Sequence, residues 1–107
     1  MKDCVGCTRK HLAQAMIIHE EEVFMGYPEH IERVIGHLAE AAREVFSYSK
    51  PFAAILRNHR LAVMDNDTHM PPYMELLEFV TIMAAAKNAS LPCPGVPDTL
   101  DVNTTKT

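Results

Sequence analysis

Hydrophobic residues recur every three or four positions along most of this chain, a spacing that places them on one face of an α-helix. In the first such segment the face comprises Leu12, Ala15, Met16, His19 and Val23. Thr8 is a favourable N-cap residue, and Gly26 is a favourable residue just beyond a helix end. The pattern therefore predicts a first helix that begins at Thr8 and ends before Gly26.

Prolines divide the rest of the helical pattern. Pro28 suits the first turn of a second helix, which the apolar spacing extends to about Tyr48. The residue before Pro51 is biased away from the helical conformation, so a break is expected there. A third helix is predicted over residues 51–64, with Phe52, Ile55, Leu56, His59 and Val63 on one side.

The fourth predicted helix, residues 72–87, is apolar on nearly every side. A helix of this kind lies either at the centre of a protein or against another subunit, so we expect a homo-oligomer. The chain then changes character, with three prolines within residues 91–97 and a polar end. We predict an all-α, four-helix antiparallel bundle-like domain over residues 1–90 and an extended C-terminal arm over residues 91–107.

Composition narrows the classes of function. The 107 residues carry a net charge of −4, which argues against a general nucleic-acid binder. No apolar run reaches the length of a membrane span, and the first residues lack the apolar core of a signal peptide. We therefore expect a cytoplasmic protein with reduced thiols, in which closely spaced cysteines suggest metal or redox chemistry more than a structural disulfide.

A possible metal site opens the first helix. Cys4 and Cys7 are separated by two residues, and His11 follows in the expected first turns. A structural zinc site needs four such ligands, so Cys93 from the C-terminal arm is the candidate for the fourth. The alternative is a pair of thiols with no role. A thioredoxin-like redox site is disfavoured because no strand precedes the helix.

The same segment could instead bind an anion. Arg9, Lys10 and His11 fall in the first turn of the predicted helix, where free amide groups and the helix dipole already favour negative charge. Arg57 and Arg60 lie on one face of the third helix and could hold a phosphate, with His37 as a further ligand-binding candidate. The alternative is that these cations are solvated or pair with glutamates.

A polar stripe follows the second helix at His30, Arg33, His37, Glu40 and Glu44. No histidine has a glutamate three residues before it, so a ferritin-type di-iron site is excluded. We interpret the stripe as a hydrated face with spaced ion pairs. A metal-dependent hydrolase using His37, Glu40 and Glu44 is the least favoured alternative.

Three short motifs together resemble a group of small phage and prophage proteins without an assigned activity. They are Cys4-x2-Cys7-x-Arg9-Lys10-His11-Leu12, then Gly26-Tyr27-Pro28-x-His30, then Gly36-His37-Leu38-Ala39-Glu40-Ala41. The resemblance covers roughly residues 4–45. It implies a phage-type accessory protein in the host cytoplasm and identifies no catalytic residue. By analogy of size and origin, such a protein would inhibit a host factor or sequester a nucleotide immune signal.

These observations favour a non-catalytic protein that binds a small anionic ligand, of nucleotide type, as a homo-oligomer. Arg9, Lys10, His11, His37, Arg57 and Arg60 are the candidate ligand-binding residues. The alternative is a zinc-stabilised interaction domain that inhibits a host factor, with Cys4, Cys7, His11 and Cys93 as ligands. No cofactor other than zinc is expected.

Overall fold

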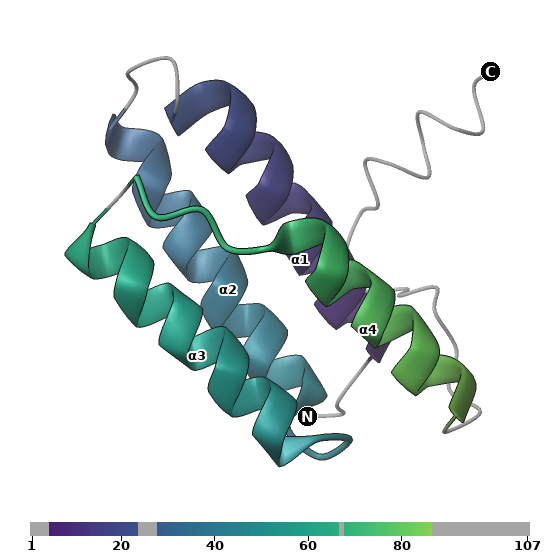
Figure 1. Ribbon diagram of the computed structural model, residues 1–107. Coiled ribbons are helices and arrows are strands. Elements are labelled where there is room, and N and C mark those ends of the chain that lie inside the picture. Colours follow the sequence, from purple (N-terminus) through teal and green to yellow (C-terminus); the bar gives the residue numbers. More distant parts are fainter. Residues whose placement is uncertain (1–4, 24–27, 67, 87–107) are drawn as a thin grey trace, which may run out of the picture.

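The computed structural model describes residues 5–23, 28–66 and 68–86, and this part of the chain is helical without strands (Figure 1). Its four α-helices are α1 (Val5–Ile17), α2 (Ile31–Val45), α3 (Lys50–Asp65) and α4 (Tyr73–Ala86). A short π-helix, η1 (Ile18–Val23), and a 3-10 turn, η2 (Pro28–His30), lie between α1 and α2. The all-α prediction is confirmed, and the predicted arm over residues 91–107 lies outside the described residues.

Helix α2 lies at the centre of the arrangement. It packs against α1 on one side and α3 on the other, and α4 packs on α1 (Figure 1). The chain reverses direction between α1 and α2 and again between α2 and α3. Helices α1 and α3 are held apart by α2 and do not pack on each other. Side chains on α1 therefore meet those on α2, and Phe52 of α3 reaches Phe79 of α4, with ring centroids 4.7 Å apart.

The core joins the apolar faces predicted for the helices. Leu12, Ala15, Val34, Leu38, Phe52, Leu56 and Val80 are among its fully buried or nearly buried members. His19 is also buried, and its Nδ1 atom forms a hydrogen bond of 2.9 Å with the hydroxyl of Tyr73 on α4. This bond satisfies an imidazole inside the core, as a buried polar group requires.

Several helix boundaries differ from the sequence-based prediction: α1 is followed by η1 after Ile17, and α2 runs from Ile31 to Val45 instead of from Pro28 to about Tyr48. Two further differences, at the starts of α1 and α3, involve side-chain hydrogen bonds. Helix α1 already includes Val5, so Thr8 is not its N-cap; the buried Thr8 hydroxyl instead donates to the carbonyl oxygen of Ala41 on α2, at 3.0 Å. The local pattern could not reveal this contact, because it joins residues 33 positions apart. Helix α3 begins at Lys50, one residue before the predicted start, because the Ser49 hydroxyl caps it by accepting from the amide of Phe52.

Helix α4 buries one face against α1 and leaves apolar side chains on its outer face. Leu76, Val80 and Met83 are buried, whereas Met74 and Ile82 are 68% and 59% exposed. The homo-oligomer expected from this helix stays a prediction. The exposed apolar side chains of α4 are the surface through which it would form. Within the described residues, no helix combines the length and the apolar character that crossing a membrane requires.

Candidate functional site at the α1–α2 interface

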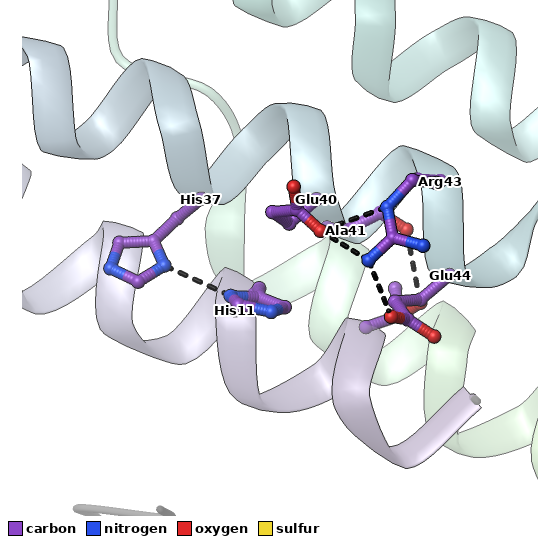
Figure 2. Close-up of polar contacts among 7 residues, drawn as sticks. His11, His37, Glu40, Ala41, Arg43 and Glu44 are labelled. Carbon is purple, nitrogen blue, oxygen red and sulfur yellow. Dashed lines mark hydrogen bonds and ion pairs between the residues drawn. The ribbon is translucent and has the colours of Figure 1, made fainter. Parts of the chain in front are cut away.

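The most concentrated chemistry among the described residues lies where α1 crosses the polar stripe of α2. His11 of α1 and His37 of α2 form a hydrogen bond between their Nδ1 atoms, which lie 2.9 Å apart, and their ring centroids are 5.2 Å apart (Figure 2). The Thr8–Ala41 hydrogen bond, one turn away on both helices, fixes the distance between the helices here. Two imidazoles that were 26 residues apart in the sequence thus form one pair.

Burial disfavours the protonated form of both imidazoles. Burial lowers the pKa of His37 to about 4, and the neighbouring His11 and Arg33 act in the same direction. Burial also lowers the pKa of His11, although Glu40 and Glu44 oppose that shift. Neutral imidazoles are the form that binds metal ions, since a protonated ring nitrogen has no lone pair to donate.

An ion-pair network continues the site along α2. The Nε atom of Arg43 donates to Oε1 of Glu40 at 2.9 Å, and its Nη2 atom donates both to that oxygen and to Oε2 of Glu44, the latter at 2.9 Å (Figure 2). The Glu44 side chain is 9% exposed, and its Oε1 atom has no hydrogen-bond partner in the described part of the chain. Among the described residues, the buried Glu44 carboxylate thus accepts from Arg43 with Oε2, while its Oε1 atom accepts no hydrogen bond.

The polar stripe is therefore only partly the hydrated face predicted from the sequence. Arg33 and Arg43 are exposed, but His37 is half-buried and Glu44 is buried. The prediction was wrong at these two positions because it treated α2 in isolation. Helix α1 packs over this side, so α2 has two covered faces. The apolar spacing revealed only the face that carries Val34, Leu38 and Val45.

The expectation of reduced thiols is wrong for Cys7, and with it the predicted role of Cys7 in a cysteine-based zinc site. Cys7 is buried and disulfide-bonded, and Cys4 and Cys93 lie outside the described residues. A sulfur in a disulfide is not the thiolate that zinc requires, so Cys7 is not a ligand in this state. Of the four predicted metal ligands, His11 is the one that the structure places against another potential ligand, His37.

The predicted cationic residues do not share one site. Lys10 is 7% exposed on α1, and Arg9 is half-buried there, already within the helix rather than at its free end. Arg57 belongs to α3, where its guanidinium lies 5.3 Å from the ring centroid of Phe46, and Arg60 bonds to the sulfur of Met64. Arg57 and Arg60 thus belong to α3, and Arg9 and Lys10 to α1, two helices that pack on α2 without close backbone contact between them.

A second imidazole pair escaped the sequence analysis. Nδ1 of His59 on α3 lies 3.2 Å from Nε2 of His69, which precedes α4, and the two rings are stacked. His69 is held in place because its amide donates to the carbonyl oxygen of Asn66 at 2.9 Å. The contact between His59 and His69 depends on the turn at Asn66, which helical spacing in the sequence does not predict. Unlike His11, His59 has no carboxylate among the charges that shift its pKa.

Comparisons with protein-family models, with curated proteins and with solved structures find no match for this chain. The geometry of the α1–α2 interface is therefore the basis for assigning a function.

Proposed function

We propose that this protein binds a divalent transition-metal ion, of the zinc class, between α1 and α2. The observation that carries the proposal is the approach of the His11 and His37 Nδ1 atoms to 2.9 Å from two different helices. Zinc is held by imidazole nitrogens at about 2.0–2.1 Å, which puts two nitrogens of a tetrahedral site about 3.4 Å apart. The two Nδ1 atoms share a hydrogen bond, so the donor ring would have to carry its proton on Nε2 instead. A small separation of the rings would then admit an ion.

Glu40 is the natural third ligand. It lies one turn from His37 on α2, and its charge acts on both imidazoles, as the causes of their pKa shifts indicate. Its side chain is about half exposed, so its carboxylate can turn without disturbing the core. Two histidines and one glutamate form a known ligand set for zinc, and that set leaves one coordination position open.

The three ligands are not yet assembled around one point. No group of three or more histidine, cysteine, aspartate or glutamate side chains within residues 5–23, 28–66 and 68–86 is arranged to hold a metal ion. The Glu40 carboxylate accepts from Arg43, and the two imidazole Nδ1 atoms are hydrogen-bonded to each other. On this proposal, binding of the ion turns Glu40 away from Arg43 and towards the imidazoles.

The anionic ligand predicted from the sequence has a place in this proposal. An ion with an open position binds water or an anion there, so a small anionic molecule would be held by the metal rather than by Arg57 and Arg60 on α3. The proposal assigns binding and no chemical reaction to the site. A phage-type role against a host factor remains a prediction of the sequence resemblance.

Isothermal titration of the full-length protein with zinc chloride, in buffer without chelator, tests the metal site. We expect one ion per chain. His11→Ala and His37→Ala should each weaken zinc binding on the order of 100-fold, because loss of a residue that only supports a ligand can already weaken binding by that much. His59→Ala is the matched control, since it breaks the other imidazole pair and should leave this binding unchanged.

Two results would refute the proposed function. One is the absence of zinc binding to the wild-type protein while circular dichroism shows it folded. The other is binding that His59→Ala abolishes and that both His11→Ala and His37→Ala retain, which would assign the ion to the second imidazole pair.

A further inference from the structure

Arg43 places one nitrogen atom between two carboxylates. Its Nη2 atom donates to Oε1 of Glu40 and to Oε2 of Glu44, which lie one turn apart on the same helix face (Figure 2). A divalent cation bridging the two carboxylates would take a comparable position. The guanidinium therefore acts as a positive charge built into the chain, beside the pair formed by His11 and His37.

The two ends of this bridge differ in how firmly they are held. Glu44 is buried, with 9% of its side chain exposed, whereas the Glu40 side chain is 46% exposed. The buried carboxylate needs a counter-charge, because an unpaired charge in the interior is costly. The exposed carboxylate has no such need, since water can replace the guanidinium. Arg43 can thus release Glu40 and stay on Glu44.

We propose that Arg43 is a competing cation that limits the metal affinity of the site by holding the Glu40 carboxylate away from His11 and His37. This inference rests on the proposed function of the α1–α2 interface. Arg43 is a positioning residue in this account, because it acts on the ion through Glu40 and does not touch it. Its removal should strengthen metal binding, the opposite of what the loss of a supporting contact would do.

Zinc titration of the Arg43→Gln variant tests the inference. An exposed ion pair contributes at most about 1 kcal/mol, so freeing Glu40 should tighten zinc binding by up to about fivefold. Arg57→Gln is the matched control: it removes the same charge from α3, away from the site, and should leave the affinity within twofold. Thermal unfolding of the metal-free Arg43→Gln variant should show no gain in stability, so tighter binding would not reflect a better-folded protein.

The inference would be overturned if Arg43→Gln bound zinc with an affinity equal to or weaker than that of wild type. The proposed zinc site itself would then still stand. An equal gain in Arg57→Gln would also overturn it, because the effect would then be one of net charge. If wild type binds no zinc but Arg43→Gln does, the proposed function of the wild-type protein is refuted, whereas the competition of Arg43 with the ion for Glu40 is supported. Absence of binding in both proteins would refute the metal site and this role of Arg43 together.

Discussion

The hydroxyl of Thr8 donates to the carbonyl oxygen of Ala41 across the α1–α2 interface, at 3.0 Å and fully shielded from solvent. It lies one turn from the imidazole pair on both helices, since His11 follows Thr8 by three residues and Ala41 follows His37 by four. A single buried polar contact thus links the packing of the two helices to the geometry of the site between them.

Replacing Thr8 with valine keeps the shape of the side chain and removes this hydrogen bond. We expect the free energy of unfolding to fall by about 1 kcal/mol, the usual net value of such a bond, as measured by urea denaturation. Thr81→Val is the control, because its hydroxyl bonds within α4 at an exposed position and its loss should cost less than about 0.5 kcal/mol. Equal losses in both variants would show that the Thr8 bond does not help to join the helices.

Removal of the Ser49 hydroxyl should destabilise the start of α3. The side-chain oxygen accepts from the amide of Phe52 at 3.2 Å, and N-cap serines of this kind contribute about 1 kcal/mol. Ser49→Ala should therefore lower the free energy of unfolding by that amount, and Ser49→Gly by only a few tenths. The same cost for glycine and alanine would contradict a capping role.

Stability should fall as the solution becomes acidic. The folded protein holds the pKa of His37 at about 4, against an ordinary value of 6.5, so the unfolded chain binds this proton more readily. The contribution of His37 to the free energy of unfolding is therefore fully present above about pH 6.5 and is lost as the pH falls through 4. Urea denaturation at pH 7 and pH 5 should show a smaller loss for His37→Gln than for wild type. A His37 proton resonance that titrates near pH 6.5 would contradict this expectation.

The sequence predicted the elements of the fold better than the site. Helical spacing placed Leu12, Val34, Leu38 and Leu56 in the core, because burial on one face of a helix leaves a local pattern. The approach of His11 to His37 leaves no such pattern, since it depends on how α1 crosses α2. His37 and His11 were each proposed as ligand-binding residues, but from different arguments and without their contact.

The same reasoning explains the errors on α3. Ile55 was expected on the apolar side, yet it is 44% exposed, because the helices that pack on α3 cover only part of its surface. Spacing identifies which residues share a face but not how much of that face a neighbour covers. The coverage of each face depends on how the helices are arranged in the folded protein.

The outer face of α4 predicts self-association. Ile82 is 59% exposed on a helix whose other apolar face already packs on α1. Ile82→Glu should shift an oligomer towards the monomer in sedimentation velocity experiments, because a charge does not bury in an apolar contact. Thr81→Glu adds the same charge at a neighbouring exposed position and serves as the control. A wild-type protein that sediments as a monomer at all concentrations would contradict this prediction.

The most direct test of the account is a long-range proton–nitrogen NMR spectrum of the imidazole rings, recorded as zinc is added at neutral pH. We expect the Nδ1 resonances of His11 and His37 to shift together up to one equivalent, while those of His59 and His69 stay in place. Unchanged resonances of His11 and His37 in the presence of excess zinc would contradict the metal site between α1 and α2.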